Sequence, residues 1–170
     1  MTWTYAACRN LTGSPVCGLN VVTMHGTYDG CINLTGSPVC GENVTDMVNA
    51  YSYCSNLTGS PVCGNNVTNM VATYMYCSNM FGNSYFYSPN ISNVQNCFSG
   101  RYSNNVLSIY TLSNSTTMTT LLYNNASSLV GKEITWTNDT ATNGCYYNTQ
   151  YNIYIYPVDN VAAARTANGD

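Results

Sequence analysis

The sequence predicts an α/β repeat protein, in which stacked 23-residue repeats each supply a strand plus a short helix, closed by a β-rich C-terminal cap. The segment Asn-Leu-Thr-Gly-Ser-Pro-Val-Cys-Gly occurs unchanged at 10–18, 33–41 and 56–64, which fixes the period. A cysteine stands two residues before each copy, so copies start near 8, 31 and 54, with a degenerate copy at 77. The period is lost after about 101. We therefore expect an array over 1–101 and a cap over 102–170.

The second half of each repeat predicts the short helix. In the first repeat Val21, Met24, Tyr28 and Cys31 are separated by three, four and three residues, and the next two repeats keep this spacing. Such spacing places apolar side chains on one face of a helix of two to three turns. A Thr and its neighbouring Asn can cap the start of this helix.

The first half of each repeat predicts a short strand, with one inward column of leucines and another of valines. Each proline lacks an N–H group and belongs at the first strand position or facing away from a ladder bond. In the fourth copy Tyr85-Phe86-Tyr87 replaces the strand, and Arg101 falls one residue after the expected cysteine. The expected ladder residues are Cys8, Cys31, Cys54, Cys77, Leu11, Leu34, Leu57, Val16, Val39, Val62, Met24, Met47 and Met70.

The region after the array has different patterns. Residues 106–112, 134–137 and 151–156 read as strands, since polar and apolar residues alternate along them. In the last of these, Ile153 and Ile155 oppose Tyr154 and Tyr156. We expect a short helix around Met118–Leu122, a polar loop over 138–144, and a tail over 162–170 that is mobile or ordered only at an interface.

The composition excludes several classes of function. The chain has 170 residues, a net charge of -3 and only 6% charged residues, while Asn, Thr and Ser together number 62. Four basic residues are too few for a phosphate-binding stripe, so we expect no nucleic-acid partner. No apolar run approaches the length of about 20 residues that crosses a bilayer, so we expect no membrane insertion. The N-terminus has neither a basic start nor an apolar stretch, so no secretory signal is expected.

The nine cysteines admit three interpretations. A cysteine repeated in phase is favoured as a small buried apolar residue, so we expect mostly reduced, buried ladders. Stacked cysteines also lie within disulfide range, which leaves cross-linking open. Metal binding ranks last, because the sequence has no Cys-x-x-Cys and no Cys/His cluster. We expect no metal and no cofactor.

The sequence offers little for catalysis. His25 is the only histidine, and Asp29 can pair with it across one helical turn. No nucleophile elbow accompanies them, and the seven scattered acids form no convincing general acid–base pair. We therefore expect no enzymatic activity and no catalytic residue.

Tyrosine is the surface residue that indicates binding. Tyr and Asn together suit sugar or protein recognition, because phenol rings give contact area and amides give adaptable hydrogen bonds. Repeated Asn43 and Asn66 are also placed to form an amide ladder from repeat to repeat. The candidate binding surface comprises Tyr53, Tyr76, Tyr85, Tyr87, Tyr154 and Tyr156.

The repeat pattern resembles the BspA-like leucine-rich repeat. The likeness lies in Cys-x-x-Leu, Asn-Val-Thr-(Asp/Asn)-Met and Tyr-x-x-Cys, most closely over 31–47 and 54–70, and it covers roughly 8–101. That family has Leu-x-Leu in the strand and a longer loop, whereas here Ser60-Pro61-Val62 stands in the strand and about three loop residues are absent. The resemblance implies a surface protein active in adhesion. Short, near-identical arrays also look like proteins of tailed-bacteriophage tail or head fibres.

These observations lead to one functional hypothesis and two alternatives. The hypothesis is a non-enzymatic bacteriophage protein on the virion surface or in a fibre, involved in host attachment or fibre assembly. Its expected partners are other virion proteins or copies of itself, and a host surface glycan or protein, with 102–170 making most of the contact. The alternatives are a BspA-like adhesin on the bacterial cell surface and, from another class, a glycan hydrolase.

Overall fold

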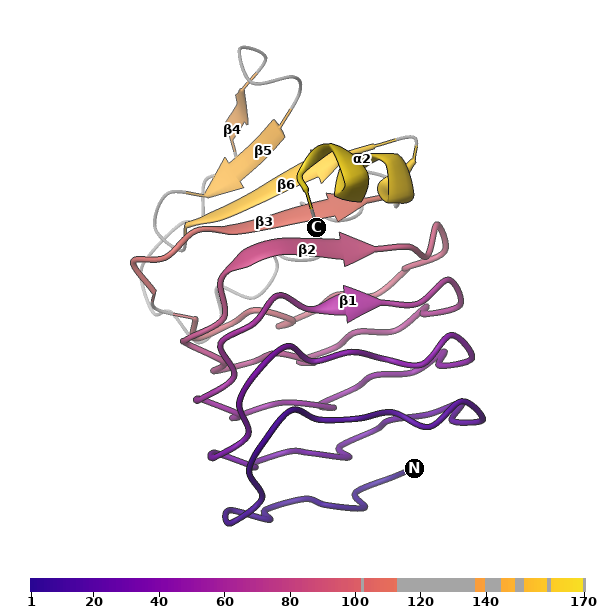
Figure 1. Cartoon of the computed structure of the whole chain (residues 1–170), viewed down its shortest axis with the longest axis vertical. Helices are drawn as coiled ribbons and strands as arrows, with labels where there is room; N and C mark the ends of the chain where they lie inside the picture. Colours follow the sequence, from indigo (N-terminus) through magenta and orange to yellow (C-terminus); the bar gives the residue numbers. More distant parts are fainter. Residues whose placement is uncertain (102, 113–136, 140–144, 149–151, 159, 170) are drawn as a thin grey trace.

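The computed structural model describes residues 1–101, 103–112, 137–139, 145–148, 152–158 and 160–169. Over the array, successive repeats form coils that lie one upon the next, with the N-terminus at one end and the C-terminal segments at the other (Figure 1). Backbone hydrogen bonds join equivalent positions in neighbouring coils all along this stack. The predicted stacking of 23-residue repeats is therefore present.

The predicted short helices are wrong. Over 21–31 and the matching segments, the backbone forms consecutive turns instead. Alternate residues such as Gly26 and Tyr28 donate their N–H groups to the next coil, while the residues between them bond back three residues, as Thr27 does to Met24. Two residues on the turn side of each coil also have a positive φ, as Gly26 (58°) and Gly30 (71°) do, and this conformation interrupts a right-handed helix.

The side chains inside the coils nevertheless follow the predicted spacing. The turns place every third or fourth residue inward, as a helix does, so Met24, Met47 and Met70 are fully buried. The leucine column is also confirmed, because Leu34 and Leu57 are buried and Leu11 is packed against the core at the open end. Of the cysteine column, Cys31, Cys54 and Cys77 are buried and Cys8 is exposed.

The valine column does not point inward. Val16 is 74% exposed and Val39 also faces solvent, while Val62 is half-buried. The flanking prolines and cysteines occupy the inward positions, as Pro61 and Cys63 do on either side of Val62. Because side chains alternate across a strand, inward Pro and Cys force the intervening valine outward. The valines still align from coil to coil, since Val39 forms a parallel bridge with Val62.

One six-stranded sheet links the array to the C-terminal segments. Its order is β1-β2-β3-β6-β5-β4, in which β1, β2, β3 and β6 are parallel and β5 and β4 are antiparallel additions. The strands are β1 (Val62–Cys63), β2 (Gly82–Phe86), β3 (Leu107–Thr111), β4 (Thr137–Asp139), β5 (Cys145–Asn148) and β6 (Ile153–Pro157). The sheet thus runs continuously across the expected boundary near 101, because β2 pairs with β3.

The C-terminal region contains two of the predicted strands, whereas the predicted loop is partly wrong. The strands expected at 106–112 and 151–156 correspond to β3 and β6, and Ile153 and Ile155 are buried as expected. The expected polar loop is wrong at its start, because Asn138 and Asp139 lie in β4. The expected helix around Met118–Leu122, and most of the strand at 134–137, lie outside the described residues.

The tail was expected to be mobile or ordered only at an interface, whereas it forms a helix, α2 (Val161–Ala167). Its start is capped by Asn160, whose side chain accepts a hydrogen bond from the N–H of Ala163. Val161 is buried, and α2 packs against β2 and β3 (Figure 1). The N-cap and the packing of Val161 against the sheet stabilise a helix that is too short to be stable alone.

The core combines an aromatic stack with side-chain bonds between coils. Rings at equivalent positions stack through the array at 5.3–5.7 Å between centroids, from Tyr5 through Tyr28, Tyr51 and Tyr74 to Phe98. Thiols bond from coil to coil, since Cys54 Sγ lies 3.0 Å from the Tyr28 carbonyl oxygen. Asn43 and Asn66 also link coils, but their amides donate to backbone carbonyls of the preceding coil rather than to each other.

We expect the thiols to differ sharply in reactivity. The eight described cysteines outside β5 form no disulfide, and only Cys8 is exposed while Cys17 is half-buried. A thiol-specific reagent under native conditions should label Cys8 quickly and Cys17 slowly, and burial should protect the others until the chain is unfolded. Mass measurement of the labelled chain checks this. Rapid native labelling of Cys54 or Cys77 would contradict the buried ladder.

Candidate functional site

The most prominent aromatic surface is a stacked pair formed by Tyr53 and Tyr76. The two rings lie 4.8 Å apart between centroids with an interplanar angle of 19°, and the residues remain 48% and 38% exposed. Both have φ near 59°, and both side chains lie on the outside of the turns. The equivalent position one coil earlier is Gly30, which has no side chain, so the face of Tyr53 toward that coil is not covered by a residue of its own column.

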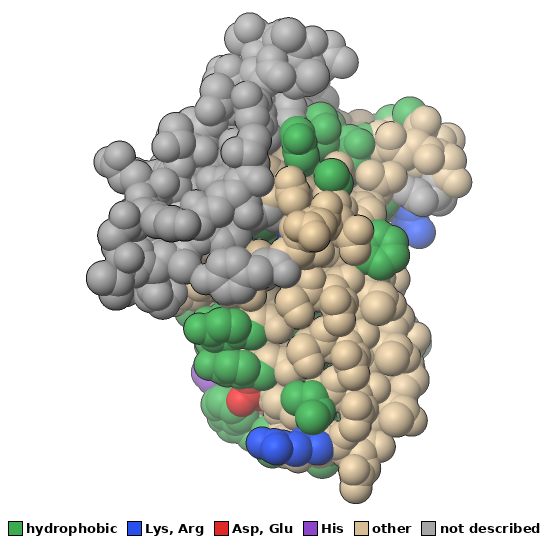
Figure 2. Space-filling view, turned by 90° about the vertical axis from the view of Figure 1, so that its left-hand side faces the viewer, with side chains coloured by type: hydrophobic (Ala, Val, Ile, Leu, Met, Phe, Trp, Pro, Cys, Tyr) green, Lys and Arg blue, Asp and Glu red, His purple; other side chains and the backbone are tan. Residues whose placement is uncertain are grey.

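The surface of the array carries few charged side chains, and the carboxyl group nearest to the pair is that of Asp29, which contacts Ser52, the residue before Tyr53. On the face shown in Figure 2, hydrophobic side chains form small separate patches on a surface made mainly of neutral polar side chains and backbone, with few charged groups. On the far side of the pair, a Cβ at Gly100 would overlap the ring of Tyr76, so that ring lies directly over the glycine. Two stacked, exposed phenol rings suit stacking against a sugar ring or a planar side chain.

The other predicted binding tyrosines divide into two groups. Tyr85 is buried, and it is not part of an exposed surface, because α2 covers its strand and Arg165 lies 5.6 Å over its ring. Tyr87, Tyr154 and Tyr156 are half-buried. Tyr156 continues an outer stack on the sheet, with its ring 4.8 Å from that of Tyr110. The structure therefore brings Tyr53 and Tyr76 together and places the other four elsewhere.

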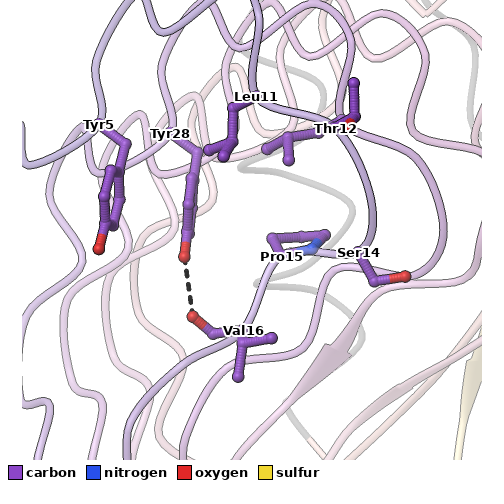
Figure 3. Close-up of a pocket in the computed structure, with 8 residues that line it drawn as sticks. Tyr5, Leu11, Thr12, Ser14, Pro15, Val16 and Tyr28 are labelled. Atoms are coloured by element: carbon purple, nitrogen blue, oxygen red, sulfur yellow. Dashed lines mark hydrogen bonds between the residues drawn. The ribbon is translucent and has the colours of Figure 1, made fainter.

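A second candidate, which sequence reasoning missed, lies at the N-terminal end of the array. Figure 3 shows the rings of Tyr5 and Tyr28 face to face on one side of a hollow, with Pro15 across from them and Leu11 and Val16 at its two ends. The hollow measures about 210 Å³. Tyr28 donates its hydroxyl to the Val16 carbonyl at 2.8 Å and so closes one wall.

A sequence signal for this end was present. Met1, Tyr5 and Cys8 have the same four- and three-residue spacing as Met24, Tyr28 and Cys31. Residues 1–8 accordingly form the second half of a coil and bond to the first complete repeat. This half-coil leaves Trp3 and Tyr5 exposed at the end of the stack.

His25 does not form a catalytic arrangement. Its Nδ1 lies 3.6 Å from a carboxylate oxygen of Asp46 in the next coil, and not beside Asp29, the partner that the sequence spacing also allows. The Thr23 hydroxyl donates to the same carboxylate oxygen at 3.4 Å. A hydroxyl nucleophile needs the imidazole beside it as the base, whereas here the carboxylate stands between the hydroxyl and the imidazole. This geometry stabilises the coil junction without activating the hydroxyl.

The described part of the chain offers neither a cluster of metal ligands nor a helix that could cross a membrane. Within it, no group of three or more His, Cys, Asp or Glu side chains is arranged to hold a metal ion. In the same residues, no helix is long and apolar enough to span a bilayer.

Comparison with known proteins gives no relative: no family model matches the chain, and neither a curated protein nor a solved structure resembles it significantly.

Proposed function

We propose that this chain is a non-enzymatic surface or fibre protein of a bacteriophage virion that takes part in host attachment or fibre assembly, and that its array is a short variant of the leucine-rich-repeat solenoid. The observation that supports binding most directly is the exposed, stacked pair of Tyr53 and Tyr76. The virion setting rests on the resemblance of the near-identical repeats to those of tailed-phage fibre proteins.

The construction of the array suits such a role. On the turn side of each complete coil, four N–H groups, such as those of Met24, Gly26, Tyr28 and Gly30, donate to backbone carbonyls of the next coil, and stacked core rings run through the array. Side chains that project from such a stack keep fixed positions relative to one another. Preorganised rings lose little conformational freedom on binding, which favours adhesion to a repetitive surface such as a glycan.

The proposal is tested by binding of the labelled chain to a panel of intact bacteria and to polysaccharides extracted from their surfaces. The double variant Y53S/Y76S should bind about tenfold more weakly to any surface that the unaltered protein binds, since each lost stacking contact is worth about 0.5–1.5 kcal/mol. Phe81→Ser is the matched control, because Phe81 is 46% exposed but lies outside the pair. It should leave binding unchanged.

Three outcomes would contradict the proposal. One is the absence of binding to any surface in the panel, and another is equal binding by the double variant. A third is failure of antibodies against the chain to label purified phage particles. Shortening of the polysaccharides during incubation would instead support the glycan hydrolase.

A further inference from the structure

The cysteines of the array form two columns whose sulfur atoms make opposite kinds of hydrogen bond. In the first column, the thiols of Cys31, Cys54 and Cys77 each donate, at 3.0 Å, to a backbone carbonyl of the preceding coil. A thiol that donates to a carbonyl is held in its protonated, unreactive form. The second column, on the side of the coils that holds β1, comprises Cys17, Cys40 and Cys63.

In the second column, the sulfur of Cys40 accepts hydrogen bonds instead. The N–H group of Gly64 in the next coil donates to Cys40 Sγ, with 2.9 Å between nitrogen and sulfur. The thiol of Cys63 is also hydrogen bonded to Cys40. Donors that point at a sulfur atom stabilise its negative charge. The hydrogen bond with Cys63 lowers the pKa of the Cys40 thiol, burial opposes this change, and the Gly64 N–H group lowers the pKa further.

Cys40 and Cys63 lie side by side in the stack. Val39 forms a parallel bridge with Val62, so the residues that follow them, Cys40 and Cys63, are in register. Neighbouring strands lie about 4.8 Å apart, and a disulfide joins residues whose Cα atoms are about 4.4–6.8 Å apart. Both cysteine side chains point into the array. The spacing of the pair is therefore compatible with a disulfide while the coils stay stacked.

The two sulfur atoms differ in their access to solvent. Cys40 is 6% exposed, whereas Cys63 is completely buried. Cys63 Sγ lies 3.7 Å from the Tyr74 hydroxyl oxygen and 3.9 Å from Met70 Sδ, inside its own coil. An oxidant from solvent therefore meets Cys40 first, and the small exposed area suits a molecule close to water in size. Hydrogen peroxide meets this condition.

We propose that Cys40 and Cys63 are a peroxide-reactive pair that forms a disulfide between neighbouring coils. The Cys40 thiolate attacks one oxygen of hydrogen peroxide: an S–O bond forms, the O–O bond breaks, and the released hydroxide takes up a proton to become water. The Cys63 sulfur then attacks the sulfur of this sulfenic acid: the S–S bond forms, the S–O bond breaks, and the leaving hydroxide takes the Cys63 thiol proton as a second water. Two thiols are oxidised while one peroxide is reduced to two waters.

The other thiols of the array are less suited to this reaction. In the first column, the thiols of Cys54 and Cys77 donate to carbonyls, and burial raises their pKa. In the second column, burial also raises the pKa of the half-buried Cys17. The reactive pair lies apart from Tyr53 and Tyr76, so the proposal is independent of the proposed function. Its product joins two successive repeats covalently.

The test treats the reduced full chain with a small molar excess of hydrogen peroxide. The remaining thiols are then blocked with an alkylating reagent in denaturant, and the chain is cleaved after methionine. Met47 separates Cys40 from Cys63, so the disulfide should link fragment 25–47 to fragment 48–70. Mass measurement should show the linked pair after peroxide treatment, and a reductant should separate the two fragments.

Two variants identify the cysteines involved. Cys63→Ser should abolish the link and leave a sulfenic acid at Cys40, which dimedone added with the peroxide should trap. Cys54→Ala is the matched control, because Cys54 lies in the same fragment but belongs to the first column. It should leave the link unchanged.

The proposal is overturned if peroxide produces no link between these two fragments in the unaltered chain, a result that does not depend on how any variant folds. It is equally overturned if the link persists in Cys63→Ser or disappears in Cys54→Ala. A link from fragment 25–47 to the fragment that contains Cys17 in place of the expected one would also refute the assignment of Cys63 as the partner.

Discussion

The protein should unfold cooperatively in alkali, losing about 4 kcal/mol of stability per pH unit above roughly pH 9. Burial raises the pKa of the Cys54, Cys77 and Cys97 thiols far above the ordinary value. In the unfolded chain the same thiols ionise near pH 8.5–9. Above that pH the unfolded state therefore binds fewer protons than the folded state, and stability falls as pH rises.

Two buried phenols add to the effect at higher pH. Burial raises the pKa of Tyr51 and Tyr74 well above the usual value, so above about pH 10 their ionisation also favours the unfolded state. Arg101 acts in the opposite direction, because burial lowers its pKa to about 10. One group cannot offset five. Domains of this size have about 5–15 kcal/mol of stability in total, so unfolding should be complete near pH 11.

Denaturant titrations at a series of pH values measure this slope, and tyrosinate absorbance should rise in the same transition. The double variant C54A/C77A should reduce the slope by about 3 kcal/mol per pH unit, whatever it costs in stability at neutral pH. Cys8→Ala, which changes an exposed thiol, is the matched control and should leave the slope unchanged. A stability that is flat from pH 9 to pH 10.5 would refute the account.

The repeat period and much of the core were predictable from sequence, whereas the conformation of the turn side was not. Identical repeats fix which residues align, and the leucine and methionine columns follow. The spacing of Met24, Tyr28 and Cys31 is compatible with a helix and equally with consecutive turns that place the same residues inward. Gly26 and Gly30 were the available signal against a helix, but later repeats carry Asn49 and Tyr53 with the same positive φ. Stacking of one coil on the next overrides their local preference.

The errors elsewhere have related causes. The predicted strand segment Pro15 to Cys17 has only three residues, too few alternations to show which side chains face inward, and the more hydrophobic Val16 lies on the outside. Tyr85 was expected at the surface because its burial depends on α2, some 80 residues later in the chain. Tyr53 and Tyr76 were predicted correctly as exposed, since they lie between inward positions that the period itself defines.

Arg101→Ala should destabilise the protein by about 3–5 kcal/mol, among the largest effects of any single substitution. Arg101 follows the cysteine column and is completely buried. Its Nε and Nη2 donate to the Met80 carbonyl at 3.1 and 2.7 Å, and Nη2 also donates to the Asn105 carbonyl at 2.7 Å. The guanidinium thus ties the fourth coil to the segment that leads into β3.

Removal of this side chain leaves a cavity and two carbonyls that lose their charged donor, and both costs add. Arg101→Lys keeps the charge but loses the planar fork that reaches both carbonyls, so it should cost about 2 kcal/mol. Arg9→Ala, on an exposed arginine, should change stability by less than about 0.5 kcal/mol. Denaturant unfolding at pH 7 compares the three variants. Arg101→Met removes the charge and the hydrogen bonds but keeps much of the side-chain volume. If this variant were as stable as the unaltered protein, Arg101 would act by filling space, and its hydrogen bonds would not join the array to the sheet.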